Sequence, residues 1–212
     1  RMIQIGLPAG LQSVIFNISN VMIQSSINSF GADVVAANTA AGNLDSFIYT
    51  ACNSVYHASM TFTSQNLGAG KPERIWMGVK ASTLMMIVYW AFTFCVLMFG
   101  ARTFALLFVD ASELEILKNT ELFLHISVSF FPVLGLLCIL RYTIQGVGYT
   151  NLAMLSGVLE MIARILVSLL AVPAFGYLAV CFGDPTAWIF ADAFLIPAFI
   201  YVYRRILRMK KN

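Results

Sequence analysis

Two long hydrophobic segments are separated by the polar stretch Ser64-Gln65-Asn66-Leu67-Gly68-Ala69-Gly70-Lys71-Pro72-Glu73-Arg74. This stretch contains two glycines and three charged residues, Lys71, Glu73 and Arg74. Such an interruption is typical of a loop at a membrane face, where the chain returns to water and basic residues reappear. The pattern therefore predicts that the hydrophobic segments on both sides lie in a lipid bilayer.

The composition supports a membrane protein. Hydrophobic residues make up 59% of the 212 residues and charged residues 11%, whereas soluble domains have about 45–50% and about 25%. A soluble bundle this apolar would have too little polar surface to cover its core, so lipid is the better solvent. The net charge is only +3, which does not suggest nucleic acid as a partner.

Six hydrophobic segments can be drawn, each long enough to cross about 30 Å of hydrocarbon with about 20 helical residues. They predict an all-α, polytopic membrane protein whose residues 1–212 form a single lobe of six transmembrane helices. The first two segments exceed the bilayer thickness, so tilt or protrusion is expected. The expected helices run over residues 3–30, 34–66, 76–108, 120–147, 150–175 and 186–208.

Basic residues are distributed unevenly between the two membrane faces that six crossings create. One face receives both termini and most of the Lys and Arg residues, namely Arg1, Lys71, Arg74, Lys80, Arg141, Arg204, Arg205, Arg208, Lys210 and Lys211. The other face receives only two basic residues, Arg102 and Lys118, together with most of the acidic ones. The positive-inside rule then places both termini in the cytoplasm. The chain begins in a segment that is already hydrophobic, so we expect it to be a piece of a longer protein.

The first segment carries a continuous polar face. Its members follow one another at spacings of three and four residues, so they share one side of a helix; they are Ser13, Asn17, Asn20, Gln24 and Asn28. Lipid would penalise this face. It therefore either lines a hydrated cavity or holds neighbouring helices together through hydrogen bonds.

The second segment repeats this pattern around an acidic residue, Asp45. The other cavity-lining candidates on the same stripe are Asn38, Tyr49, Asn53 and Tyr56. Asp45 lies about 16 Å along the helix, and an acid at such a depth is a candidate functional group, because burying it in the ionised form is costly. A carboxyl that accepts a proton there can carry a coupling ion. The alternative is a structural carboxyl that is hydrogen-bonded to neighbouring Asn or Tyr side chains.

Two charged residues of the fifth segment, Glu160 and Arg164, are four positions apart. Glu before Arg at this spacing is the favourable order for an ion pair within one helix. Neither charge can face lipid alone, so we expect the pair to face the interior of the bundle. Asp192, in the last segment, is expected within a turn or two of the outer boundary, where it can reach water.

Signatures of enzymes are absent from the sequence. There is no GxSxG, HExxH, P-loop or GxGxxG motif. The four cysteines form no CxxC pair and have no metal-ligand spacing. We therefore expect no enzyme activity, no metal site, no cofactor and no ATP hydrolysis within this chain.

Four stretches resemble multidrug and toxic compound extrusion (MATE) transporters. In the loop after the second segment, the matching residues are Gln65, Asn66, Gly68, Ala69, Gly70 and Arg74. The other matching stretches are Gly6-Leu7-Pro8-Ala9-Gly10-Leu11-Gln12, Ala36-Ala37-Asn38-Thr39-Ala40-Ala41-Gly42-Asn43 and Gln145-Gly146-Val147-Gly148. Together they cover nearly the whole chain.

The resemblance implies one lobe of a twelve-helix transporter, and the basic tail suggests the C-terminal lobe. It implies export of small amphipathic or cationic organic compounds across the plasma (inner) membrane, driven by H⁺ or Na⁺, by alternating access with the missing N-terminal six-helix lobe. Some MATE proteins carry an acid in the first helix of this lobe, and here that helix has none. Asp45 is then the candidate for coupling within this lobe. A lipid-linked precursor flippase of the same superfamily and a membrane scaffold without transport are the alternatives.

Overall fold

The structure is a computed structural model. It describes residues 2–211, except the side chains of residues 2–9, 12, 13, 16, 19, 22, 47, 48, 51, 210 and 211. Its helices are α1 (Met2–Asn28), α2 (Ala32–Gly68), α3 (Glu73–Ala105), α4 (Leu114–Val147), α5 (Thr150–Leu166), the π-helical turn η1 (Val167–Ala171), α6 (Val172–Phe175), α7 (Tyr177–Cys181) and α8 (Gly183–Lys211).

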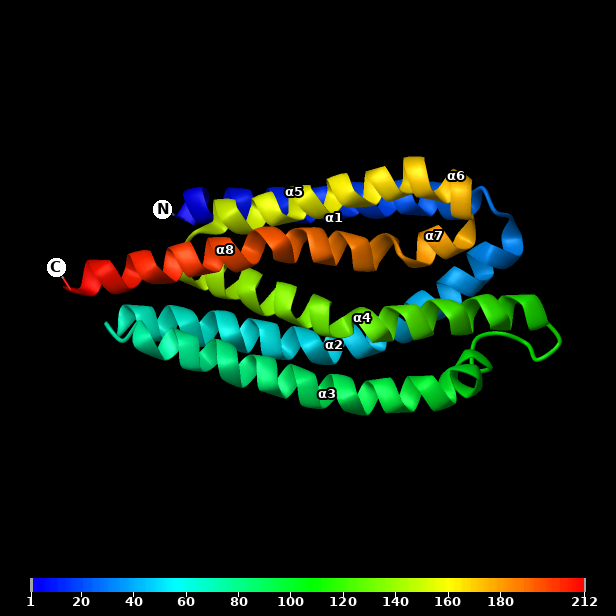
Figure 1. The fold of residues 1–212 in the computed structure, drawn as a ribbon, viewed down its shortest axis with the longest axis horizontal. Coiled ribbons are helices and arrows are strands. Elements are labelled where there is room, and N and C mark those ends of the chain that lie inside the picture. Colours follow the sequence, from blue (N-terminus) through cyan, green and yellow to red (C-terminus); the bar gives the residue numbers. More distant parts are fainter. Residues whose placement is uncertain (1, 212) are drawn as a thin grey trace.

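The long helices run antiparallel to their neighbours in the chain (Figure 1). The two labelled chain ends, the α2–α3 turn and the α4–α5 turn all lie at one end of the bundle (Figure 1). The α1–α2 turn, the α3–α4 connection and the short helices α6 and α7 lie at the other end. This alternation follows from the succession of hydrophobic segments and polar turns in the sequence.

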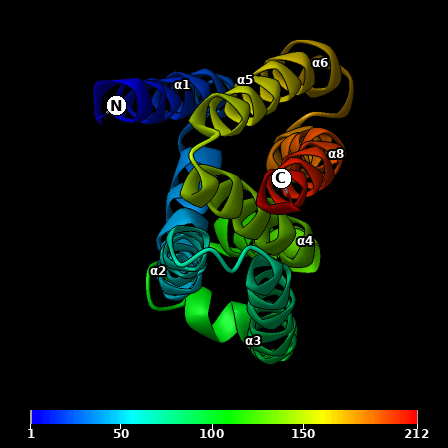
Figure 2. The same ribbon diagram turned by 90° about the vertical axis from the view of Figure 1, so that its left-hand side faces the viewer.

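Seen from its end, the long helices of the bundle lie in pairs (Figure 2). Helices α1 and α5 form one side, α2 and α3 the opposite side, and α4 and α8 lie between them. Helix α4 packs against α2, α3 and α8, whereas α1 packs mainly against α5. Helix α1 is therefore peripheral and leaves much of its surface open.

The outer surface of the bundle is strongly apolar. Four of the described helical segments are long and apolar enough to cross a membrane, namely 73–105, 114–147, 150–175 and 177–209. Large apolar side chains are exposed on them, for example Phe99 at 92% and Phe175 at 70%. In lipid such a surface needs no further cover, and the expected all-α membrane bundle is confirmed.

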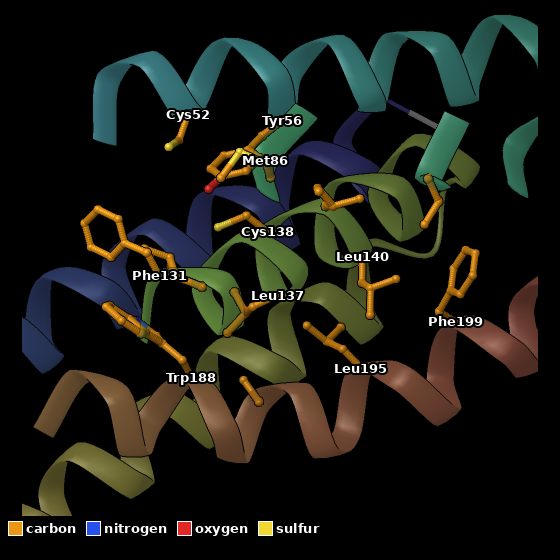
Figure 3. Packing of buried hydrophobic residues seen from close by; sticks show 14 of the residues in the cluster. Cys52, Tyr56, Met86, Phe131, Leu137, Cys138, Leu140, Trp188, Leu195 and Phe199 are labelled. Atoms are coloured by element: carbon orange, nitrogen blue, oxygen red, sulfur yellow. The ribbon is translucent and has the colours of Figure 1, made fainter. Parts of the chain in front are cut away.

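The main core lies between α2, α3, α4 and α8 (Figure 3). Phe131 of α4 meets Trp188 of α8 edge to face, with 6.4 Å between ring centroids. Pro132 lies inside α4 and has no N–H to give to the carbonyl of Val128 one turn earlier. The indole Nε1 of Trp90 donates to that carbonyl at 2.8 Å, so a neighbouring helix replaces the hydrogen bond that proline removes.

Two of the expected segments differ from simple helices. The fifth contains the π-helical turn η1, and Pro173 stands at the start of α6 immediately after it. A π-turn and a proline are both established causes of a bend in a helix. The last segment is preceded by α7, and α8 begins at Gly183 rather than near 186.

The polar stretch between the second and third hydrophobic segments contains a helix C-cap. Gly70 has a φ of 68°, and the N–H groups of Gly70 and Lys71 donate to the carbonyls of Leu67 and Asn66. This is a Schellman arrangement, which needs a left-handed residue and therefore favours glycine. Gly148 (φ 97°) closes α4 in the same way, and the Ser64 hydroxyl donates to the carbonyl of Gly146 at 2.9 Å, which ties the two turns together.

Substitutions of the two glycines in this loop should have opposite effects. An alanine at Gly70 must adopt a left-handed conformation, so Gly70→Ala should lower the free energy of unfolding by about 1–2 kcal/mol. Gly68 is helical and has open space around its Cα, so Gly68→Ala should be neutral or stabilising. Thermal unfolding of both variants in detergent tests this, and equal melting temperatures would contradict the assignment of the cap.

Candidate transport surface

Helix α1 presents its polar face openly. Asn17, Asn20, Gln24 and Asn28 are all exposed, and the Gln24 amide donates to Asn28 Oδ1 at 3.0 Å. The side chain of Ser13, the fifth predicted member, lies outside the described residues. Towards α5, Ile27 is buried, Ser26 is hydrogen-bonded to Ser168, and Asn20 accepts a hydrogen bond from Arg164.

The predicted stripe of α2 divides into two parts. Asn38, Asp45, Tyr49 and Asn53 are partly exposed, as a surface facing a cavity requires. Tyr56 is completely buried, although the sequence suggested a cavity position. It stacks on Tyr142 of α4 with ring centroids 5.9 Å apart, because α2 packs against α4 and this part of the stripe lies in the main core.

Two side-chain oxygens of this α2 surface lack partners. Asp45 Oδ1 and Asn38 Oδ1 are buried and accept no hydrogen bond from any described residue. The negative charge of Asp184, at the start of α8, acts on the Asp45 carboxyl. A buried oxygen without a donor is costly unless a proton or a cation satisfies it. Asp45 thus has the unmet acceptor capacity that a site for a coupling ion needs.

Ion pairs inside the lobe connect different helices. Arg141 of α4 pairs with Glu160 of α5 and donates to Ser156 at 3.0 Å. Arg164 of α5 pairs with Asp184 of α8 at 3.0 Å and donates to Asn20 of α1 at 3.2 Å. The sequence suggested a pair between Glu160 and Arg164 within one helix, and this interpretation is wrong. Successive turns of α5 face different helices, so each charge finds its partner there.

Asp192 also differs from expectation. We expected it to reach water near the outer boundary, but only 6% of it is exposed. The last helix begins earlier than predicted, so Asp192 lies more than two turns inside it. There the charges of Arg141 on α4 and Glu160 on α5 act on its carboxyl.

Sequence comparison identifies the family. The MatE family profile matches residues 8–170, which is most of the chain. The chain belongs to the MatE family. The matched part includes the capped loop, Asp45 and three of the four residues of the two ion pairs. The resemblance to MATE transporters that the sequence suggested is thereby confirmed.

Individual relatives agree with this assignment. The chain is 25% identical over 139 residues to an FAD transporter of Shewanella oneidensis, and the match covers 66% of this chain and 30% of the relative. It is 33% identical over 73 residues to the probable multidrug resistance protein YpnP of Bacillus subtilis, which covers 34% of this chain and 16% of that protein.

The fold is that of solved MATE transporters. The structure superposes on the Vibrio cholerae MATE transporter VcmN in its bent form with a TM-score of 0.84 and 19% sequence identity. The superposition covers 99% of this chain and 47% of VcmN. The MatE chain is thus a multi-pass membrane protein that spans about half the length of the transporters it resembles, which corresponds to one lobe.

Proposed function

We propose that this MatE chain is the C-terminal lobe of an exporter that uses a cation gradient to expel small amphipathic or cationic organic compounds. The observation that carries the proposal is the open polar surface of α1 and α2, with Asp45 beside it, in a lobe whose other outer faces are apolar. Lipid would penalise this surface. A second lobe and water between the lobes would cover it.

In this proposal Asp45 binds the coupling ion, H⁺ or Na⁺, and no other cofactor takes part. The ion satisfies the buried Oδ1 of Asp45 while the cavity is open to one side. The coupling ion is released to the other side of the membrane when one lobe rocks against the other. Exchange between these two states couples the gradient to the export of the organic compound.

The charge of this surface favours cationic over anionic substrates. A flippase for lipid-linked precursors, or a carrier of FAD as named for the Shewanella relative, must neutralise phosphates. The interior arginines Arg141 and Arg164 are already paired with Glu160 and Asp184. The polar surface itself contributes amides, hydroxyls and Asp45, which suit a cation.

We also propose that the protein lies in the plasma (inner) membrane with both termini in the cytoplasm. The basic side chains Lys71, Arg74, Arg204, Arg205 and Arg208 are exposed at the end that holds the termini. Asp33, Asp110, Glu113 and Glu115 are exposed at the opposite end. This distribution matches the positive-inside rule.

The requirement for a second lobe gives a direct test of the proposal. Reconstituted alone, this lobe should produce no gradient-driven dye efflux, because it supplies only one wall of the cavity. Co-reconstitution with an N-terminal MatE lobe should restore efflux, and collapsing the H⁺ and Na⁺ gradients should abolish it. Efflux by a demonstrated monomer of the lobe would refute the proposal.

A further inference from the structure

The buried carboxyl of Asp192 lies outside the surface described above. Asp192 belongs to α8, is 6% exposed, and its Oδ1 accepts no hydrogen bond from the part of the chain that the structure describes. Trp188 and Leu195, one turn before and after it, are directed towards α4 (Figure 3). Asp192 is therefore held between helices rather than beside the open face.

One ion pair acts on Asp192. The positive charge of Arg141 favours the ionised form of the Asp192 carboxyl, and the negative charge of Glu160 disfavours it. The side chains of Arg141 and Glu160 are only 6% and 3% exposed. Arg141 already pairs with Glu160 and donates its Nε hydrogen to Ser156. The cluster thus contains one cation and two carboxyl groups, all of them buried.

No charge beyond this pair is seen to neutralise Asp192 from the described side chains of the other helices. Helix α5 also carries Arg164, which pairs with Asp184. Helix α7 contributes only neutral groups that can titrate, Tyr177 and Cys181, and α4 contributes Cys138 beside Arg141. Among the described residues, the packed neighbours of Asp192 therefore leave one negative charge in excess if both carboxyls are ionised.

We propose that Asp192 binds a proton and so forms a proton site at the junction of α4, α5 and α8, apart from Asp45. An unpaired carboxylate in such surroundings costs several kcal/mol, and the group takes up a proton instead. The proton comes from water and returns to it, with only the O–H bond made and broken. When residue 160 carries no charge, as in Glu160→Gln, Asp192 ionises and becomes the carboxylate partner of Arg141. This site does not depend on the transport role proposed for Asp45.

The pH dependence of thermal stability tests the proton. Above the pKa of a free carboxyl, the folded protein holds on Asp192 a proton that the unfolded chain has released, so stability falls as the pH rises until Asp192 itself ionises. Asparagine has nearly the same shape as the protonated carboxyl but cannot ionise. Asp192→Asn should therefore lose the part of the decrease in stability with pH that comes from Asp192. In the complete transporter, the melting temperature of Asp192→Asn relative to the wild type should rise by about 2 °C or more between pH 5 and pH 8.

Asp110→Asn is the matched control. Asp110 is exposed in the α3–α4 connection, and hydrogen bonds from the N–H and hydroxyl of Ser112 hold the pKa of its carboxyl below the usual value. The Asp110 carboxyl stays ionised from pH 5 to pH 8. Asp110→Asn should therefore show the same dependence of melting temperature on pH as the wild type. Parallel curves for Asp192→Asn and the wild type would overturn the proposal. A slope that appears only in sodium buffer, and not in choline buffer, would assign a metal cation and also overturn it.

A double-mutant cycle tests the exchange of partners. Glu160→Gln should fold, because Asp192 then ionises and pairs with Arg141. Its melting temperature should no longer show the part of the pH dependence that comes from Asp192. The double variant Glu160→Gln/Asp192→Asn leaves Arg141 without a carboxylate, so its melting temperature should drop by more than the sum of the single changes. Additive changes in melting temperature, or a wild-type dependence of melting temperature on pH in Glu160→Gln, would contradict the inference.

Discussion

Arg141→Leu should lower the free energy of unfolding by about 3–5 kcal/mol, which is the cost typical of removing one partner from a buried ion pair. The arginine is 5% exposed and pairs with Glu160, which is 2% exposed. Its removal leaves the carboxyl of Glu160 without a counter-ion and Ser156 without a donor. Leucine fills part of the volume but satisfies neither group.

Arg102→Leu is the matched control for this variant. Arg102 lies in the last turn of α3 and is exposed, so the same substitution there should change the stability by no more than about 0.5 kcal/mol. Chemical denaturation or thermal unfolding of both variants in the same detergent measures the difference. Similar stabilities of Arg141→Leu and the wild type would mean that the pair between α4 and α5 does not support the fold.

Much of the architecture could be predicted from local patterns. Long apolar runs marked the helices, and glycines with polar neighbours marked the turns, as at Gly70 and Gly148. Both turns follow from short-range geometry, because a C-cap needs a left-handed residue close in sequence. Element ends were less predictable: α4 begins at Leu114 instead of near 120, since helices can continue beyond the hydrocarbon.

Pairings between helices could not be predicted in the same way. The spacing of Glu160 and Arg164 shows that they share a side of one helix, but it does not show which helix lies opposite. Arg141 and Asp184 become their partners only through the packing of α4 and α8 on α5. For the same reason the sequence placed Tyr56 on the cavity wall.

Asp45→Asn should reduce drug efflux by about tenfold or more per folded molecule, with little effect on folding. Asparagine keeps the shape of the carboxyl and one acceptor, but it neither takes up a proton nor offers a charge to a cation. A purely structural Asp45 would tolerate this change. Asp33→Asn is the control, because Asp33 is exposed in the first turn of the same helix and should keep wild-type efflux.

The most direct test of a coupling role for this lobe is the pH profile of gradient-driven efflux by the complete transporter, measured for the wild type and Asp45→Asn. Efflux is normalised to the amount of folded protein, and the H⁺ and Na⁺ gradients are imposed separately. We predict that the wild type responds to pH or to sodium and that Asp45→Asn loses this response together with most of its efflux. Two profiles that coincide over the whole pH range would contradict the account, and the coupling site would then have to lie outside α2.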